Sequence, residues 1–337
     1  MILNIIGNGF DLYHGLPSSY YYFSCFLINN HLEFYEEMCK SYNLKYQKNS
    51  HPITHDFDYT AEDIFWKDFE KNLGLIDDSF IVDTSITDLG LEYDDYTELD
   101  IKENITAEEI KSYFEKWIEK TLDINKNYKL IKKYMQSSKN AIYFGENEYF
   151  LQFNYTHTLE KIYGIKEEKI YYIHGECNGS YSELIVGHGN DDRIEEIERK
   201  ISELEENFDY SQKNYNNIEE YKCLLNHITD LKKNVGECRL KSQEFYKKNE
   251  LVIDTIKIFG LSLGEVDIPY MVDIKNRWKN AKWEFSYYEE AEKDRIKEIA
   301  LDKLELNESN FKFFKFSNET ASKIKNEIIQ LQNIKEW

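Results

Sequence analysis

Residues 2–11 read ILNIIGNGFD, and this stretch decides the fold class. The aliphatic run Ile2 to Ile6 has the continuous apolar character of a strand buried on both faces, as strands of parallel sheets are. A glycine turn, Gly7-Asn8-Gly9, stops this run. Nucleotide sites of α/β proteins usually begin at such a turn, because glycine lets the backbone approach a phosphate. The sequence therefore predicts an opening βα unit.

Further short β-prone runs end in polar or glycine residues. They are predicted as strands over 149–153, 169–173, 184–186, 256–259, 282–287 and 311–316. Ser18 and Ser19 are good N-cap residues, so the first helix is predicted to follow them, and a helical stretch over 106–134 starts with the capping-box pattern Thr106-x-x-Glu109. This alternation indicates an α/β protein, with a Rossmann-like, mostly parallel sheet and flanking helices.

The domain organisation follows from a long charged stretch with few glycines. Residues 191–250 carry apolar side chains at steps of three or four, which predicts a helical hairpin inserted between two core strands. The Rossmann-like core is predicted to comprise residues 1–190 and 251–337, with a helical segment at about 60–140.

Charge and cysteine content exclude several classes of protein. The 337 residues include 42 basic and 63 acidic ones, a formal net charge of -21, so most of the surface repels phosphate backbones and nucleic-acid binding is unlikely. The 5 cysteines contain no C-x-x-C pair, which argues against a disulfide framework and a structural zinc site and favours a reducing compartment. No apolar stretch is long enough to span a membrane. We therefore expect a cytoplasmic location.

Two strand ends predict a ligand-binding turn, because ligands of α/β sheets bind outside the carboxyl ends of the strands. Small residues there let a ligand approach the backbone, and carboxylates bind ribose hydroxyls. The binding candidates are Gly7, Asn8, Gly9 and Phe10 after the first strand, and Gly260, Ser262, Gly264, Glu265 and Asp267 after the run 256–259. Without a ligand, the first stretch would be a simple strand-end turn.

Three polar side chains are the catalytic candidates. Asn154 and His174 each follow a predicted strand, and we expect these two strand ends to face one pocket. Asp11 stands directly beside the glycine turn, where its alternative role is to cap that turn. An imidazole is a common general base, although a lone histidine is more often structural.

The order of these motifs resembles the AbiH family of phage abortive-infection proteins. The stretch IIGNGFDLYHGLPSSY from Ile5 resembles the opening hallmark of that family. Later blocks agree in order across nearly the whole chain: WKDFE from Trp66, FNYTHTLE from Phe153, YIHG from Tyr172, VGHGN from Val186 and FGLSLGEVDIPY from Phe259. The resemblance implies a role in phage defence, with a phage-derived trigger.

A more distant resemblance, to sirtuin-like NAD-binding domains, bears on the chemistry. It rests on Gly7-Asn8-Gly9, then Asn154-Tyr155, His174-Gly175 and Gly260 to Ser262. The likeness implies that NAD is the ligand or substrate, that the Gly7 turn holds its pyrophosphate, that Asn154 orients the ribose or a water, and that His174 is the base. Thr156 stands where an acid is usual, and the zinc cysteines are absent, which argues against deacylase activity.

Three functions therefore remain open. The leading hypothesis is a defence enzyme that binds and hydrolyses NAD at the nicotinamide glycosidic bond. The second is a non-catalytic nucleotide sensor. The third is a nuclease acting on DNA or RNA, with metal held by Asp11, Glu70, Glu265 and Asp267, although the negative charge counts against it. Homo-oligomers are common among defence enzymes, but no heptad pattern requires one here.

Overall fold

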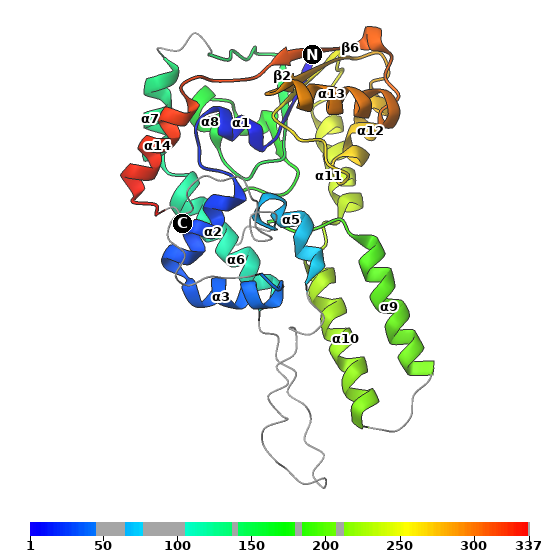
Figure 1. Ribbon diagram of the computed structural model, residues 1–337. Coiled ribbons are helices and arrows are strands. Elements are labelled where there is room, and N and C mark those ends of the chain that lie inside the picture. The colour runs from blue at the N-terminus through cyan, green and yellow to red at the C-terminus, as the bar shows by residue number, and fades with distance from the viewer. Residues whose placement is uncertain (45–64, 77–104, 137–140, 179–183, 207–211, 336–337) are drawn as a thin grey trace. The chain divides into compact units, whose positions relative to one another are not determined.

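The structure, a computed structural model, describes residues 1–44, 65–76, 105–136, 141–178, 184–206 and 212–335. Contacts within the chain define two compact units, whose elements are labelled in Figure 1. The α/β unit comprises residues 1–22, 115–185 and 234–335. The helical unit comprises the described residues of 23–114 and 186–233.

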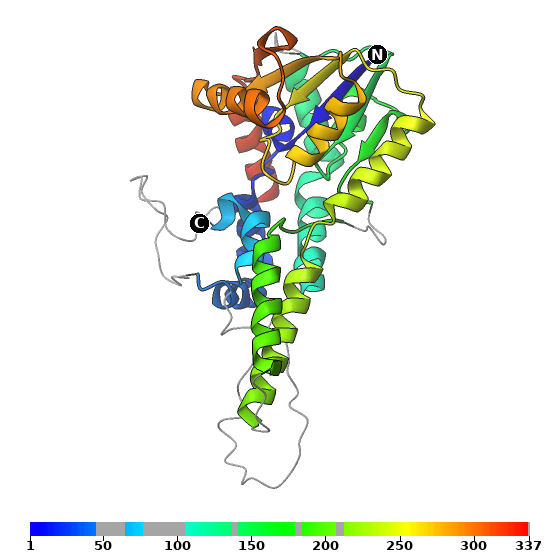
Figure 2. The ribbon, with the colours of Figure 1, turned by 90° about the vertical axis from the view of Figure 1, so that its right-hand side faces the viewer.

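A parallel sheet forms the centre of the α/β unit (Figure 2). Its strands are β1 (Ile2–Ile6), β2 (Glu148–Gln152), β3 (Ile170–Tyr172), β4 (Thr255–Phe259), β5 (Lys282–Tyr287) and β6 (Phe311–Lys315). Their order across the sheet is β3-β2-β1-β4-β5-β6, and all neighbours pair in parallel. This is the strand order of the Rossmann fold, with its reversal between β1 and β4. The predicted fold class is confirmed.

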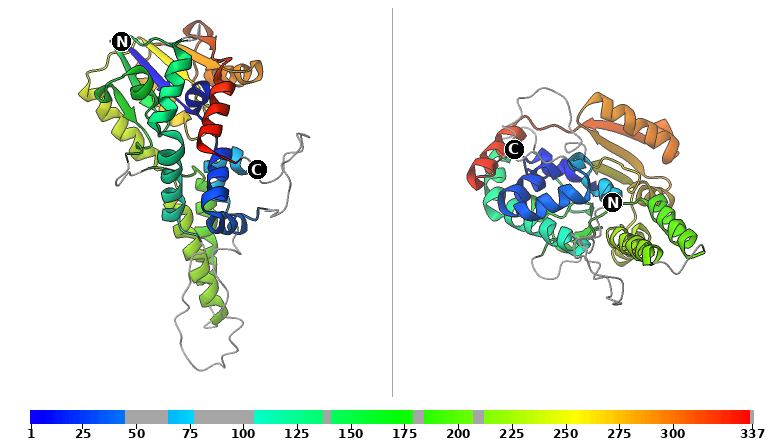
Figure 3. Two further views of the ribbon diagram at one scale, coloured as in Figure 1. Left: turned by 90° about the vertical axis from the view of Figure 1, so that its left-hand side faces the viewer. Right: turned by 60° about the horizontal axis from the view of Figure 1, so that its bottom comes forward.

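Helices cover both faces of this sheet because its strands are apolar on both sides. Leu3 and Ile5 of β1 join a core with residues of α11 (Val235–Lys248), α12 (Ile268–Arg277) and α13 (Glu290–Glu298). Ile6 instead joins a second core on the opposite face. The helices that supply this second core are α1 (Asn8–Tyr13), α7 (Asn125–Met135), α8 (Thr158–Tyr163) and α14 (Ala321–Gln332). Figure 3 shows α7 beside α14.

Local secondary structure differs from the sequence prediction at three places. The first helix is α1, which starts at Asn8 directly after β1, and not the helix after Ser19. The helical stretch predicted over 106–134 is divided by a π-helical segment, Ile118–Leu122, although its capping box forms: the Thr106 amide donates to Glu109 Oε2. Residues 184–186 form no strand, since Ile185 makes one backbone hydrogen bond to His174 in place of a ladder.

Aromatic side chains form the core of the helical unit. Phe23 of α2 (Tyr20–Asn30) makes edge contacts with the rings of Trp66, Phe69 and Phe114, and all four side chains are buried. Its other helices are α3 (Leu32–Ser41), α5 (Phe69–Asn72), α6 (Ala107–Trp117), α9 (Asp191–Glu206) and α10 (Gln212–Asp230).

The described residues of 191–250, the stretch predicted as a hairpin insertion, form three helices. Helices α9 and α10 pack against each other in the helical unit. Helix α11 lies in the α/β unit, where Arg239 donates two hydrogen bonds of 2.6 Å to the Asp273 carboxylate of α12. Residues 77–104 of the segment predicted as helical at about 60–140 lie outside the described residues.

Candidate functional site

The turns after β1 and β4 touch each other through their backbones. A Cβ atom on Gly9 would lie 2.6 Å from Gly260 Cα, and one on Gly7 would lie 2.4 Å from Leu261 Cα. Gly260 also has a φ of 62°, in the left-handed region that favours glycine. The two turns therefore meet at the point where the strand order reverses, the usual ligand position of this fold.

The amides of the first glycine turn donate within the protein. Gly7 N donates to Phe259 O at 2.9 Å, Gly9 N to Gly260 O at 2.8 Å and Phe10 N to Gly7 O at 2.9 Å. The Phe10 ring is fully buried, whereas Asn8 is exposed and accepts a hydrogen bond from Ser18 Oγ at 2.6 Å. These three amides serve the packing of the two turns.

Asp11 lies at the centre of a buried hydrogen-bond network. Thr156 Oγ1 donates to one of its carboxylate oxygens and Thr158 Oγ1 to the other, each at 2.6 Å. Burial raises the pKa of Asp11 to about 6, against the opposing effect of both threonines and Asn154. Only 1% of Asp11 is exposed, and through the two threonines its carboxylate positions the segment that follows β2.

This network predicts a pH-dependent stability. Since burial raises the pKa of Asp11 from 3.8 to about 6, the folded protein keeps a proton that the unfolded chain releases between about pH 4 and 6. Asp11 therefore destabilises the fold progressively as pH rises through this window, by about 2 to 3 kcal/mol in total. We expect the stability of Asp11→Asn, relative to wild type, to increase by that amount between pH 4 and 7. Urea denaturation at each pH measures the difference, and parallel profiles would refute the assignment.

Asn154 and His174 lie in the turns after the neighbouring strands β2 and β3. Asn154 Nδ2 donates to Gly7 O at 3.0 Å and so ties the end of β2 to the glycine turn. The His174 ring lies against Phe153 and Tyr270, with ring centroids 5.5 and 6.4 Å away. Both polar side chains are largely buried, with 6% and 5% exposed. Asn154 is thus tied to the glycine turn and also helps to lower the pKa of Asp11, while His174 is surrounded by aromatic rings.

The turn after β4 holds the remaining candidates. Gly264 N donates to Asp267 Oδ2 at 2.9 Å, so this carboxylate closes the turn. Ser262 and Glu265 are exposed. Ser262 O accepts a hydrogen bond of 2.6 Å from Arg295 of α13, a residue that the sequence analysis did not single out.

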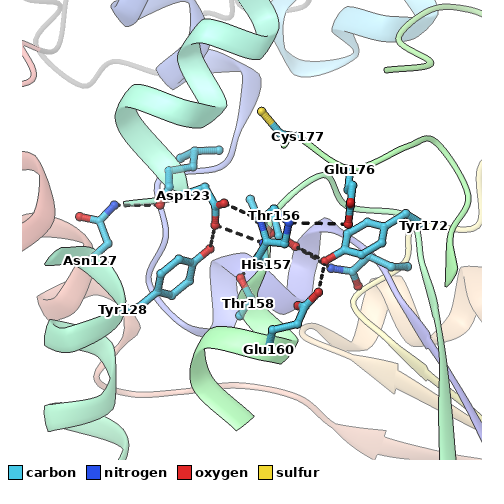
Figure 4. Close-up of polar contacts among 12 residues, drawn as sticks. Asp123, Asn127, Tyr128, Thr156, His157, Thr158, Glu160, Tyr172, Glu176 and Cys177 are labelled. Atoms are coloured by element: carbon cyan, nitrogen blue, oxygen red, sulfur yellow. Dashed lines mark hydrogen bonds and ion pairs between the residues drawn. The ribbon is translucent and has the colours of Figure 1, made fainter. Parts of the chain in front are cut away.

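A second polar group at this edge was also missed by the sequence analysis (Figure 4). His157 Nδ1 is hydrogen-bonded to Asp123 Oδ2, and His157 Nε2 lies 3.7 Å from Glu176 Oε2. Burial opposes the charged imidazole, but the hydrogen bond and charge of Asp123 outweigh it and raise the pKa of His157. The side chain of Tyr128 donates to the same Asp123 carboxylate. The sequence signal that could have found His157 is its position in the FNYTHTLE block, three residues after Asn154.

The carboxylates proposed for a nuclease do not form a metal-binding group among the described residues. Asp11 accepts from two threonines, Asp267 closes a turn, and Glu70 of the helical unit pairs with Lys233 at 2.9 Å. The group whose ligand atoms lie within 4.8 Å of one another consists of Glu115, Glu119 and Cys177. Its buried thiol has a raised pKa, which disfavours the thiolate that a metal requires.

The sheet and its polar strand ends define a Rossmann-like α/β protein with a candidate ligand site at the reversal of strand order. The family comparison is more specific, because residues 3–287 match the model described as bacteriophage abortive infection AbiH. The chain belongs to the AbiH family, as its motifs predicted, and this membership supports a role in abortive infection. Among curated proteins and among solved structures, nothing matches the chain.

In the part of the chain that the structure describes, no helix is both long and apolar enough to cross a bilayer.

Proposed function

We propose that this AbiH protein binds NAD at the carboxyl edge of its sheet and hydrolyses the bond between nicotinamide and ribose. The observation that carries the proposal is the reversal of strand order between β1 and β4, with Asn154 and His174 in the turns after the next two strands. Dinucleotides bind at this position in Rossmann-type sheets. Depletion of NAD would stop the metabolism of an infected cell, which fits the abortive-infection role of the family.

Negative charge at the carboxyl edge of the sheet suits a reaction that develops positive charge on the ribose. Cleavage leaves positive charge on the ribose, and three carboxylates lie around His157. Glu160 and Glu176 come from the segments after β2 and β3, and Asp123 precedes α7. Fixed carboxylates stabilise a developing cation more strongly in a partly buried site than in water. The nicotinamide end of the substrate is therefore assigned to the β2–β3 side.

The proposed reaction consumes one water. The bond between the nicotinamide nitrogen and ribose C1′ breaks, its electron pair leaves with nicotinamide, and a water oxygen bonds to C1′. His174 accepts the proton of that water, so the products are nicotinamide, ADP-ribose and a proton. Asn154 holds the water or the ribose, and Asp11 positions this segment through Thr156 and Thr158.

Incubation of the purified protein with NAD tests the proposal. We expect free nicotinamide and ADP-ribose to appear in equal amounts, with the reaction repeated in the presence of phage lysate to supply a trigger. Calorimetry with NAD is run on the same sample. NAD binding without nicotinamide release under either condition would favour the non-catalytic nucleotide sensor. Absence of both binding and release would refute NAD as ligand or substrate.

A further inference from the structure

The pyrophosphate of a dinucleotide bound at this edge needs hydrogen-bond donors or positive charge, and three amides of the first glycine turn are already engaged. The amides of Gly7, Gly9 and Phe10 already donate to backbone carbonyls at 2.8 to 2.9 Å. The chain carries a formal net charge of -21, so a pyrophosphate meets repulsion over most of the surface. To offset this repulsion, the site should hold a local cation near the reversal of strand order that no carboxylate neutralises.

Arg295 meets this requirement. Its guanidinium donates to Ser262 O at 2.6 Å, which fixes it to the turn after β4. Within the part of the chain that the structure describes, Arg295 has no carboxylate partner, and its side chain is exposed. The neighbouring lysines of α13 differ, because Lys293 pairs with Glu290 at 2.9 Å and Lys297 pairs with Glu308 at 3.0 Å.

The chemistry of arginine suits a phosphate ligand. A guanidinium has five N–H donors in a planar fork, and the contact with Ser262 O uses one guanidinium nitrogen. The remaining donors match the geometry of two phosphate oxygens. Ser262 is exposed and Gly264 has no side chain, so the turn leaves the backbone open to approach.

We infer that Arg295 binds the pyrophosphate of the dinucleotide against the turn Gly260 to Gly264. This inference rests on the proposed function and specifies its ligand: a nucleotide with a diphosphate bridge, its phosphates on the β4–β5 side and its nicotinamide on the β2–β3 side. Arg295 is a binding residue, distinct from the groups assigned to the chemical step.

Calorimetry with ADP-ribose tests this inference, because ADP-ribose carries the same pyrophosphate and has no nicotinamide to lose. Arg295→Ala is expected to weaken ADP-ribose binding at least tenfold, and Arg295→Lys, which keeps the charge without the fork, less strongly. Added salt should weaken binding to the wild type more than to Arg295→Ala. Lys297→Ala, on the same helix, is the matched control and should bind as the wild type does.

The outcomes separate this inference from the proposed hydrolysis. Unchanged ADP-ribose affinity in Arg295→Ala, or no binding to the wild type, would overturn the role of Arg295. Equal weakening of adenosine binding, which involves no phosphate, would also overturn it. If Arg295→Ala weakens ADP-ribose binding but NAD is never cleaved, the role of Arg295 is supported and the proposed hydrolysis is refuted. Circular dichroism of each variant verifies folding.

Discussion

Replacement of His174 by alanine is expected to lower the rate of nicotinamide release from NAD by roughly a hundredfold or more. The proposed base accepts the proton of the attacking water, and general bases contribute factors of about 10² to 10⁴. NAD binding should change little, because Arg295, and not His174, is the residue proposed to bind the phosphates. The expected signature is a large fall in kcat with a nearly constant KM. Initial rates of nicotinamide release over a range of NAD concentrations measure both constants.

Two further variants make this result decisive. His174 is largely buried beside Phe153 and Tyr270, so His174→Ala leaves a cavity. His174→Gln fills most of that space without an imidazole and should be equally inactive. His31→Gln, in the helical unit, is the matched histidine control and should keep wild-type kcat. An active His174→Gln with an unchanged pH profile would contradict the assignment of the base.

Gly260→Ala should lower the free energy of unfolding by about 3 kcal/mol or more. An added Cβ would lie 2.4 Å from the Gly9 carbonyl carbon and 2.5 Å from Phe10 N, and backbone atoms cannot move aside as a flexible side chain can. The left-handed φ of 62° adds about 1 kcal/mol for a residue with a Cβ. The free energy of unfolding, measured in urea, gives the loss directly.

Gly164→Ala is the matched control for this contact. Gly164 has a similar φ of 67° and no atom within 4 Å of the added Cβ, so it reports the backbone cost alone. We expect a loss of about 1 kcal/mol there. Equal losses at both positions would show that the turns after β1 and β4 are not in close contact. A larger loss at Gly260 would support the geometry on which the site depends.

The sequence predicted the sheet well because its signals are local. Each strand is a short apolar run, and β1 and β4 are followed directly by glycines, so periodicity and turn residues locate both strands. Helix α1 escaped prediction because Gly9 weakens any local helix signal. The contact of Gly9 with Gly260, more than 250 residues away, places that glycine and is visible only in three dimensions.

The candidate site was less predictable, since its polar groups come from distant segments. Asp123 meets His157 across 34 residues, and Arg295 reaches Ser262 across 33, and no motif links either pair. The strand-end rule did locate Asn154 and the turn of Gly260. This rule could not indicate that the amides of Gly7 and Gly9 already donate hydrogen bonds, because their acceptors lie on β4 and in the turn after it.

The most direct test of the central claim is the NAD content of bacteria that express this protein, measured during phage infection. We expect NAD to fall in infected cells with the wild-type protein, and to stay constant in uninfected cells and in infected cells with His174→Gln. Protection against phage should be lost in the same variant. Constant NAD in cells that the wild type still protects would contradict the account.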